Sequence, residues 1–598
     1  MTLIVQKFGG TSVADPQMIS AAARKAIRAQ REGKRIVMVV SAMGKNTDML
    51  VDLARQVNPR PADREMDMLL STGEQVSVAL MAMAIHALGY KAVSLTGAQI
   101  GIMTDNAHTK ARIRSISTDR IEELLDDGNI VIAAGFQGID RDHNITTLGR
   151  GGSDTTAVAL AAVLNADQCE IYTDVDGVYT TDPRVLPEAR RVDRISYDEM
   201  LELASLGAGV MHNRSIEFAK KFHVPIHVRS SLSDITGTMI MADPEFPDQA
   251  VCGAAMTPSE ARITIVGVPD VPGTSLEIFA RLADHKVNVD MIVQNVGAEG
   301  KSDISFSVPS NELELALQVL EEAAQLVEAT EVNHDDNVAK VSVVGMGMSK
   351  QTGVANRMFA ALSAENINIQ MITTSEIKIS ALVDRESARQ GLRAVHQAFA
   401  LEQEPARRRQ EAATQTSSHP VSSRSDAVNI VEHLQGIDME ELVLDDIGLD
   451  DTQALVTIVG VPNRPGVAAQ VFQSVADAGV FVDMIVQSHK GYKGQISVSF
   501  TMPAHQLSQS LEVARKLASQ LDCTTVTHRP SVAKLSVSGI GLRSHTSVAI
   551  RMFRALADAK INIDMISTSE VRVNVVVDGQ HGHTGLEKLQ TAFANVLR

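Results

Sequence analysis

The chain has no tryptophan, and aromatic residues make up only 3% of its 598 residues. This leaves few platforms on which nucleic-acid bases could stack. The three cysteines, Cys169, Cys252 and Cys523, lie far apart without CxxC spacing, which argues against a disulfide framework or a zinc site. No secretory signal precedes the strand-like segment 3–8, and no apolar run approaches the roughly 20 residues of a membrane span. We therefore expect a cytoplasmic protein without a membrane partner.

The charge balance narrows the class of partner further. The formal net charge is −17, and such a surface repels a phosphate backbone, so nucleic acid is not expected as a partner. Hydrophobic residues make up 44% and charged residues 21%, which is an ordinary globular balance. An anionic substrate would have to be captured by a local positive site. The length is too great for a single core and predicts several domains.

Residues 1–250 alternate apolar runs with helical patterns. The runs 36–40 and 130–134 are short, uninterrupted and rich in β-branched or small apolar residues, as buried parallel strands are. Residues 64–88 predict a helix rich in Met, Ala and Leu. The pattern indicates an α/β domain with a mainly parallel sheet sandwiched by helices.

The second half of the chain repeats itself. Residues 263–295 and 456–488 are identical at 18 of 33 positions, and residues 340–380 and 534–574 at 21 of 41. Weaker matches link the two families, so four related α+β units form one duplicated pair. Units of this size cannot bury both faces alone, and we expect neighbours in each pair to pack side by side. The expected bounds are 262–335, 339–400, 453–527 and 532–598, with a linker at 401–452 whose acidic second half is solvated.

Two glycine-rich turns follow strands and open helices. Lys7-Phe8-Gly9-Gly10-Thr11-Ser12 offers close backbone approach, free N–H groups and a point charge, which suits an anion. Its spacing is not that of a Walker P-loop. Gly149-Arg150-Gly151-Gly152-Ser153-Asp154 adds an arginine fork suited to a carboxylate or phosphate. Each turn alone could be structural, but two in one α/β domain favour a ligand site.

Three further segments carry polar groups. Ser71-Thr72-Gly73-Glu74 is placed at the start of a helix, where Glu74 is either a favourable first-turn charge or the partner of an ammonium group. The acidic segment 173–184 is either an Asp-rich turn or a site for a nucleotide and its metal. Thr47, His143 and His212 are each consistent with ordinary structural residues.

Together these motifs resemble those of aspartate kinase, a member of the amino-acid kinase fold, and the four repeats resemble ACT regulatory domains. The evidence is the order Lys-Phe-Gly-Gly-Thr-Ser, Ser-Thr-Gly-Glu, Gly-Arg-Gly-Gly-Ser-Asp and Thr-Asp-Val-Asp-Gly-Val-Tyr-Thr-Thr-Asp-Pro-Arg. The resemblance covers nearly the whole chain except the linker. It implies ATP- and Mg²⁺-dependent phosphorylation of the L-aspartate side chain to 4-phospho-L-aspartate, the first step toward lysine, threonine, methionine and isoleucine.

The resemblance also implies roles for single residues. Catalytic roles fall on Lys7, Glu74, Arg150 and Asp182. Aspartate binding falls on Thr47, Glu74, Arg150, Gly151, Gly152 and Ser153. ATP binding falls on Lys7, Phe8, Gly9, Gly10, Ser41, Thr173, Asp174, Tyr179, Asp182 and Arg184. No protein metal ligand is assigned. Some relatives carry a lysine where this chain has Gly209, and Arg184 or Lys220 is expected to compensate.

For the repeats, the resemblance implies amino-acid effectors, lysine and threonine, and a homodimer. In the first pair it points to Asn288, Val289, Asp290 and Gln294, together with Val354, Ala355, Asn368, Ile369, Ser375 and Glu376. In the second pair it points to Asp483 and Gln487, together with Val548, Ala549, Asn562, Ile563, Ser569 and Glu570. Phe481 stands where the first pair has Asn288, so the two kinds of site need not be equivalent.

Elementary chemistry agrees with a carboxylate kinase. A carboxylate acceptor is already ionised at pH 7, so catalysis requires positioning and charge neutralisation rather than a general base. Two alternatives stay open: a kinase for another acidic amino acid, such as glutamate or acetylglutamate, and a catalytically silent amino-acid sensor. A fused homoserine dehydrogenase is excluded because repeats and linker occupy the residues beyond 260 and no dinucleotide-binding G-x-G-x-x-G unit remains.

Overall fold

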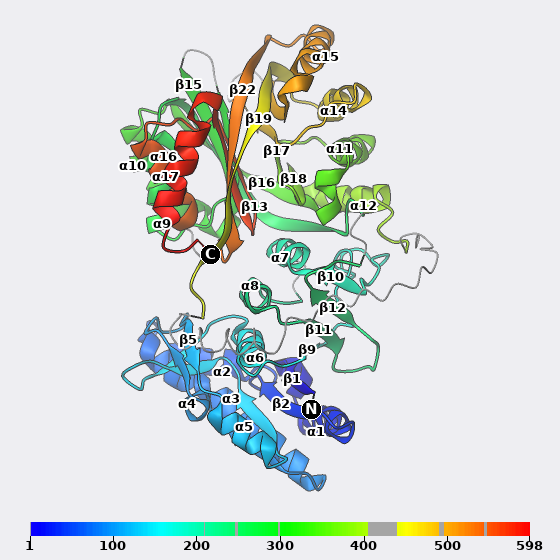
Figure 1. Cartoon of the computed structure of the whole chain (residues 1–598), viewed down its shortest axis with the longest axis vertical. Helices are drawn as coiled ribbons and strands as arrows, with labels where there is room; N and C mark the ends of the chain where they lie inside the picture. Colours follow the sequence, from blue (N-terminus) through cyan, green and yellow to red (C-terminus); the bar gives the residue numbers. More distant parts are fainter. Residues whose placement is uncertain are drawn as a thin grey trace.

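The computed structural model describes residues 2–207, 210–245, 249–296, 300–404, 439–489, 495–542 and 547–597. Gly209 and most of the expected linker, 405–438, lie outside these described residues. Figure 1 shows two parts: an N-terminal domain, and a C-terminal half built around a long twisted sheet with helices on both sides. Helices α7 (Tyr197–Ser205) and α8 (Asn213–Phe222) lie between them.

The N-terminal domain is built on an eight-stranded sheet, parallel except for the β11–β12 pair. A smaller four-stranded sheet adjoins it. The main sheet runs in the order β10 (Arg194–Ser196), β12 (Thr238–Met241), β11 (Ile226–Ser230), β9 (Gln168–Thr173), β1 (Leu3–Phe8), β2 (Arg35–Val40), β6 (Ile130–Ala134), β3 (Ala92–Leu95). The small sheet runs β5 (Ile113–Ile116), β4 (Ile102–Thr104), β7 (Gln137–Ile139), β8 (Ile145–Thr147).

Helices cover both faces of the main sheet, because its strands are apolar on both sides. On one face α1 and α3 bury Ile4, Phe8 and Met81; on the other α6 packs on β1, β2 and β9 over Val5 and Val39, and α8 packs on α6. The helices are η1 (Gly10–Val13), α1 (Pro16–Arg31), α2 (Asn46–Val57), α3 (Asp63–Ala87), α4 (Gly97–Ile100), α5 (Asp119–Asp126), α6 (Gly152–Val163), α7 and α8. The predicted α/β fold is confirmed.

Twelve strands form the sheet of the C-terminal half. Its order is β14 (Asp290–Val296), β15 (Lys301–Pro309), β13 (Gly253–Pro269), β16 (Glu331–Val344), β18 (Lys378–Asp384), β17 (Met371–Thr374), β20 (Ile485–His489), β21 (Gln495–Pro503), β19 (Val443–Pro462), β22 (Thr525–Ile540), β24 (Arg572–Asp578), β23 (Met565–Thr568). Its long helices are α9 (Thr274–Asp284), α10 (Leu313–Leu326), α11 (Val354–Ala364), α12 (Ala388–Ala398), α14 (Val467–Asp477), α15 (Leu507–Gln520), α16 (Ser547–Asp558) and α17 (Gly582–Phe593). Its short helices are η2 (Ser310–Glu312), η3 (Met346–Lys350), η4 (Arg385–Ser387), η5 (Ala504–Gln506) and η6 (Gly579–His581).

Two long strands each serve two units. Residues 253–257 of β13 pair with β16 of unit 2, and residues 260–266 pair in unit 1. In the same way, residues 443–450 of β19 pair with 534–540 of unit 4 before the strand enters unit 3. The expectation that 438–451 forms a solvated lead-in is therefore wrong for its described residues, 439–451, where Met439 and Leu442 are also buried. Its apolar residues, such as Leu444 and Ile447, are buried between exposed acidic ones.

The four units pair in a nested order, unit 1 with unit 4 and unit 2 with unit 3. We call these the outer pair and the inner pair. In the outer pair, α9 packs on α16 and the Gln294 amide donates to the Ile563 carbonyl at 2.9 Å. In the inner pair, α11 packs on α14 and the Gln487 amide donates to the Ile369 carbonyl at 2.8 Å. The expected pairing of unit 1 with unit 2, and of unit 3 with unit 4, is therefore wrong. Sequence similarity between the units indicates that they arose by duplication, but it does not indicate which units are in contact.

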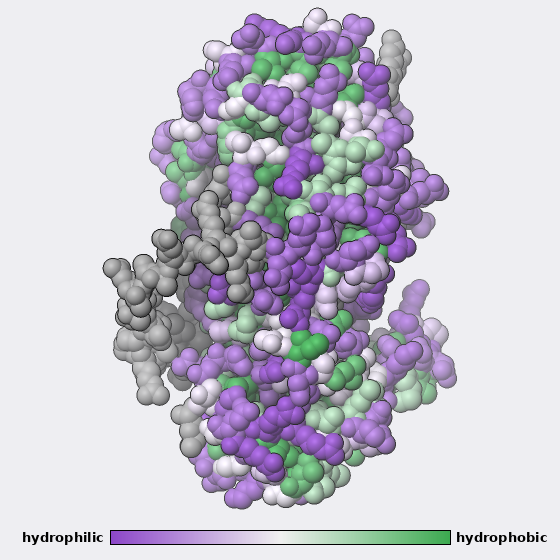
Figure 2. Space-filling model, turned by 90° about the vertical axis from the view of Figure 1, so that its right-hand side faces the viewer, coloured by the Kyte–Doolittle hydropathy of each residue, from purple (hydrophilic) through white to green (hydrophobic). Residues whose placement is uncertain are grey.

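Figure 2 shows one face of the molecule, on which hydrophilic residues predominate and hydrophobic residues lie in separate groups. Within the part of the chain that the structure describes, one helix, α3, is long and apolar enough to cross a membrane, contrary to the expectation from the sequence. Half of its most apolar window is buried inside the N-terminal domain, and it carries the buried carboxylates Asp67 and Glu74. These features are those of a core helix.

The nested pairing predicts which core aromatic residues are coupled energetically. The Phe279 and Phe553 rings lie 6.0 Å apart across the outer pair, and Phe359 and Phe472 lie 5.5 Å apart across the inner pair. Aromatic pairs contribute about 0.5–1.5 kcal/mol beyond burial. A double-mutant cycle with Phe279→Leu and Phe553→Leu, measured by urea unfolding, should show coupling of that size. Phe279→Leu with Phe472→Leu should be additive within about 0.5 kcal/mol; the reverse result would contradict the pairing.

Candidate active site

The first glycine turn meets the second through an ion pair. Lys7, at the end of β1, places its Nζ 2.6 Å from Oδ1 of Asp154 in the first turn of α6, and both side chains are largely buried. A side chain at position 10 would place its Cβ 2.8 Å from the Ala42 carbonyl, so Gly10 permits a close backbone approach there. The two turns therefore form one site, at the carboxyl ends of parallel strands, where ligands of such sheets bind.

Glu74 is a buried carboxylate with unused bonding capacity. It is only 4% exposed, one oxygen accepts from the Ala42 N–H at 3.1 Å, and Oε2 has no hydrogen-bond partner among the described residues. Burial raises the pKa of Glu74 to about 7. A buried oxygen of this kind indicates a missing cationic or donor partner, and an ammonium group of a ligand would supply one.

The position of Glu74 differs from the prediction. The segment 71–74 lies in the middle of α3 and not at a helix start, so no first-turn charge effect applies. A Cβ at Gly73 would lie 2.9 Å from Cβ of Ala42, so the absent side chain lets α3 approach the end of β2. The helix thereby carries Glu74 to the carboxyl end of the sheet.

The second glycine turn begins α6. Gly149 and Gly151 adopt left-handed backbone angles, with φ of 77° and 72°, which glycine adopts without strain. Arg150 between them is exposed, and Ser153 is buried against Gly135 at the end of β6. The arginine fork thus stands free at the surface of the site, whereas the helix start that could bind an anion lies inside it.

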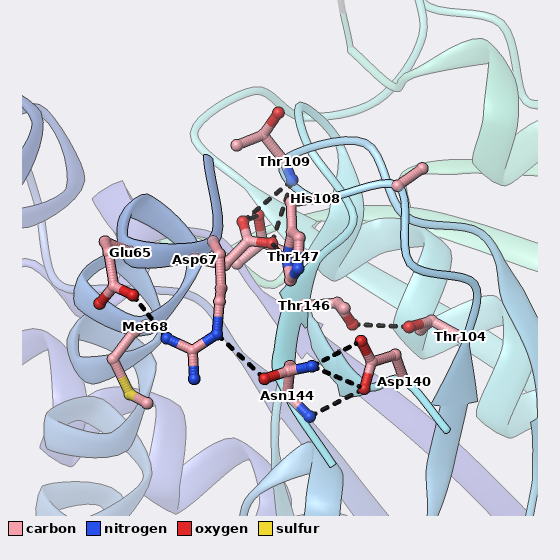
Figure 3. Close-up of polar contacts among 12 residues, drawn as sticks. Glu65, Asp67, Met68, Thr104, His108, Thr109, Asp140, Asn144, Thr146 and Thr147 are labelled. Carbon is pink, nitrogen blue, oxygen red and sulfur yellow. Dashed lines mark hydrogen bonds and ion pairs between the residues drawn. The ribbon is translucent and has the colours of Figure 1, made fainter. Parts of the chain in front are cut away.

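A second buried carboxylate on α3, Asp67, supports this turn (Figure 3). Asp67 is fully buried and accepts from the Thr147 hydroxyl at 2.5 Å and from the Thr109 N–H at 3.0 Å. Its other oxygen lies 2.7 Å from Nδ1 of His108. These bonds attach β8 and the loop before β5 to α3, directly before the Gly149 turn. The sequence reading missed Asp67, since a single acid inside a helical pattern carries no signal of burial.

The acidic segment after β9 lies beside the first turn, since the Gly9 N–H reaches the Tyr172 carbonyl at 3.4 Å. Further along it, Arg184 binds both oxygens of Asp182 at 2.8–3.2 Å, and this hydrogen bonding lowers the pKa of Asp182. The described contacts join Asp182 to Arg184 and not to Lys7. Lys220, considered as a substitute for the lysine missing at 209, instead pairs with Asp198 at 2.7 Å.

The remaining predicted residues of this domain lie around the same edge. Thr47 and Ser41 are half-buried beside the Ala42 segment, with Thr47 in the first turn of α2. The polar loop 230–234 was not predicted, yet Ser231 donates its N–H to the Thr173 carbonyl at 2.7 Å. Asp154 was also not assigned a role, although the motif placed it just after the glycine turn, at the start of the helix.

The predicted effector residues divide between the two pairs of units. The outer-pair pocket combines Asn288, Val289 and Asp290 of unit 1 with Ala549, Ser569 and Glu570 of unit 4. The inner-pair pocket combines Val354, Ala355, Ser375 and Glu376 of unit 2 with Asp483 and Phe481 of unit 3. Asn368, Ile369 and Gln487 line a further small cavity of the inner pair. Gln294, Asn562 and Ile563 form contacts within the outer pair, and Val548 is buried in its core.

This fold and site define an amino-acid kinase with an attached regulatory half. Residues 2–230 match the amino acid kinase family, and residues 263–324, 341–399, 456–516 and 535–593 each match the ACT domain. An aspartate kinase of Stutzerimonas stutzeri is 52% identical over 404 residues, which are 67% of this chain and 98% of that protein. Aspartokinase 2 of Bacillus subtilis is 50% identical over 406 residues, 68% and 99% of the respective chains. The chain belongs to the aspartate kinase family.

The solved structures to which this chain is similar include aspartate kinases, in agreement with the sequence comparisons. The aspartate kinase from Synechocystis is 39% identical, with a TM-score of 0.52 over 99% of this chain and 98% of that one. Aspartokinase III of E. coli, solved with aspartate and ADP, is 26% identical, with a TM-score of 0.57 over 66% of this chain and 99% of that one. The predicted fold class, including four ACT domains, is therefore confirmed. From here we call units 1–4 the ACT domains 1–4.

The raised pKa of Glu74 predicts a pH-dependent stability difference. A buried carboxyl with its pKa raised from 4.5 to about 7 destabilises the free enzyme as pH rises through this range, by about 3 kcal/mol in total. Glu74→Gln should therefore raise the melting temperature at pH 8 and much less at pH 5. Glu65→Gln, an exposed change on the same helix, should do neither. A lower melting temperature for Glu74→Gln at pH 8 would refute the burial argument.

Proposed function

We propose that this enzyme transfers the γ-phosphoryl group of ATP to the side-chain carboxylate of L-aspartate, giving 4-phospho-L-aspartate and ADP. The observation that carries the proposal is the unpartnered, buried oxygen of Glu74 beside two joined anion-binding turns. Such a site suits a ligand with one ammonium and two carboxylates next to a polyphosphate. The E. coli relative solved with aspartate and ADP supports the same pair of ligands.

The residues divide between the two ligands. The ammonium of aspartate binds Glu74, its α-carboxylate binds the Arg150 fork, and Thr47, Gly151, Gly152 and Ser153 complete the aspartate site. The ATP phosphates lie on the N–H groups of Gly9 and Gly10 with Lys7, and Phe8 and Ser41 line the same turn. The nucleotide lies along the acidic loop through Thr173, Asp174, Tyr179, Asp182 and Arg184.

The chain's own groups account for the transfer step. One oxygen of the aspartate side chain forms a bond to the γ-phosphorus. At the same time, the bond from the γ-phosphorus to the oxygen that bridges it to the β-phosphorus breaks. No proton needs to move, because the acceptor is ionised and ADP leaves as an anion. Lys7 neutralises charge on the phosphates, and Asp154 holds the Lys7 ammonium in place at 2.6 Å.

Magnesium, when bound together with ATP, would offset negative charge on the phosphates. Within the residues that the structure describes, no three His, Cys, Asp or Glu side chains gather as a metal site. The phosphates would thus supply most ligands, with the exposed carboxylate of Asp174 as a nearby protein contribution. We place the enzyme in the cytoplasm, in lysine, threonine, methionine and isoleucine biosynthesis, and as a homodimer, on the resemblance to its family.

For the regulatory half we propose that the outer-pair and inner-pair pockets bind lysine and threonine as feedback inhibitors. Each pocket places a carboxylate, Asp290 or Asp483, beside a helix start and a Ser-Glu turn, which suits the charged groups of an amino acid. The E. coli relative solved with lysine and aspartate supports a lysine effector. The pockets differ at Asn288 and Phe481, so we expect them to bind different amino acids.

Replacing Lys7 tests the phosphoryl-transfer site. Lys7→Ala should lower kcat about 100-fold or more, because it removes a charge that acts on the transferring group. Lys34→Ala removes a surface lysine from the same domain and should change kcat less than about twofold. ADP release coupled to NADH oxidation, with aspartate, glutamate and acetylglutamate as acceptors, gives both the rate and the specificity. An unchanged kcat in Lys7→Ala, or preference for another acceptor, would contradict the proposal.

Matched carboxylate variants test the two effector pockets. Asp290→Asn and Asp483→Asn are equivalent changes, since each carboxylate oxygen lies 2.5 Å from a lysine Nζ, Lys340 or Lys534. Each variant should weaken binding of one amino acid about tenfold or more and leave the other nearly unchanged, as lost charge-assisted bonds do. Calorimetry with lysine and threonine measures both. Failure of both amino acids to bind the unmodified enzyme would contradict sensing.

A further inference from the structure

One residue of the outer-pair pocket also contacts the kinase domain. Glu570 lines the pocket and is 3% exposed. Its Oε2 accepts from the side-chain amide of Asn213 at 2.9 Å, and its backbone N–H donates to Oε1 of Glu202 at 2.9 Å. The backbone of Glu570 is thus fixed to α7, while its side chain reaches α8.

The start of α8 in turn holds the second glycine turn. Arg214, next to Asn213, donates to the carbonyl of Leu148 and to that of Ala111, each at 2.6 Å. On the other side, His212 packs so tightly on Gly151 that a Cβ there would lie 2.3 Å from Cβ of His212. His212 and Arg214, the two neighbours of Asn213, therefore both contact the turn that carries Arg150, or the residue just before it.

We infer that the Glu570–Asn213 hydrogen bond couples the outer-pair pocket to the aspartate-binding turn, with Asn213 as a positioning residue. The inference rests on the proposed function, since it requires an amino acid in the pocket and aspartate on the turn. A ligand ammonium attracts the Glu570 carboxylate more strongly than a neutral amide does. Occupation of the pocket weakens the bond to Asn213, shifts the start of α8 and lowers aspartate affinity.

Among the described residues, no matching contact joins the inner-pair pocket to α8. Glu376 occupies the equivalent place in its Ser-Glu turn, but it is about one-third exposed and pairs with Arg572 of ACT domain 4. The inner pair reaches the kinase domain through other contacts: Lys378 Nζ lies 2.8 Å from Oε2 of Glu202 in α7, and the buried His396 of α12 lies 2.9 Å from the Thr180 hydroxyl in the acidic segment 173–184. The coupling to the aspartate turn is thus a property of the outer pair.

The experiment measures linkage and not activity alone. Calorimetry gives the Kd of lysine and of threonine with and without saturating aspartate, for the full-length enzyme and for Asn213→Ala. Thermodynamic reciprocity requires that aspartate weakens binding of the outer-pair effector by the same factor by which that effector weakens binding of aspartate. We expect about fivefold or more in the unmodified enzyme, typical of allosteric coupling, and less than about twofold in Asn213→Ala. In steady-state assays, the effector should raise KM for aspartate in the unmodified enzyme and much less in Asn213→Ala. KM for ATP should not change.

Two further variants separate loss of the Glu570–Asn213 bond from general loosening of α8 or failure to fold. Lys221→Ala is the matched control, since Lys221 also ties α8 to the segment before β19, through the Glu441 carbonyl at 2.8 Å, and is not one of the residues that line the outer-pair pocket. It should retain the coupling. Asn213→Ser, which suits a helix start, replaces Asn213→Ala if that variant fails to fold and should lose the coupling.

Three results would overturn the inference. Full coupling in Asn213→Ala or Asn213→Ser would show the bond to be a structural contact only, and loss in Lys221→Ala would show a nonspecific effect of loosening α8. In either case the proposed function stands. If neither lysine nor threonine binds the unmodified enzyme, the sensing proposal and the coupling fail together.

Discussion

Each ACT domain covers one face of its sheet with two helices and leaves the other face apolar. In the C-terminal half these uncovered faces meet in one central core that includes Met291, Met371, Met484 and Met565. The inner pair is joined there by strand pairing between β17 and β20, at Thr373 and Val486. The need to cover these faces therefore decides which domains become neighbours, and with that which residues line each effector pocket.

Much of the fold could be read from the sequence because it rests on local patterns. Apolar runs give β2 and β6, and an apolar-rich segment gives α3, since buried parallel strands and core helices differ in length and composition. The glycine turns were found for a similar reason, because only certain residues permit tight backbone approach. Contacts between distant segments had no such signal. Neither the Lys7–Asp154 pair nor the burial of Asp67 could be predicted from spacing.

The pairing of the ACT domains illustrates this limit. Internal similarity correctly identified four units and one duplication, but it could not show that ACT domain 1 contacts ACT domain 4. That choice depends on β13 and β19, each of which crosses from one sheet region to another. The composition around Leu444 did not indicate a strand, because exposed acidic residues stand between its buried apolar ones.

The nested arrangement has a consequence for synthesis of the chain. Gln294 of ACT domain 1 bonds to Ile563, which lies 269 residues later. Ribosomes therefore release ACT domain 1 long before its partner exists, and its uncovered face stays exposed until ACT domain 4 emerges. A prematurely terminated chain would retain a complete kinase domain and an apolar surface of the kind that chaperones and proteases recognise.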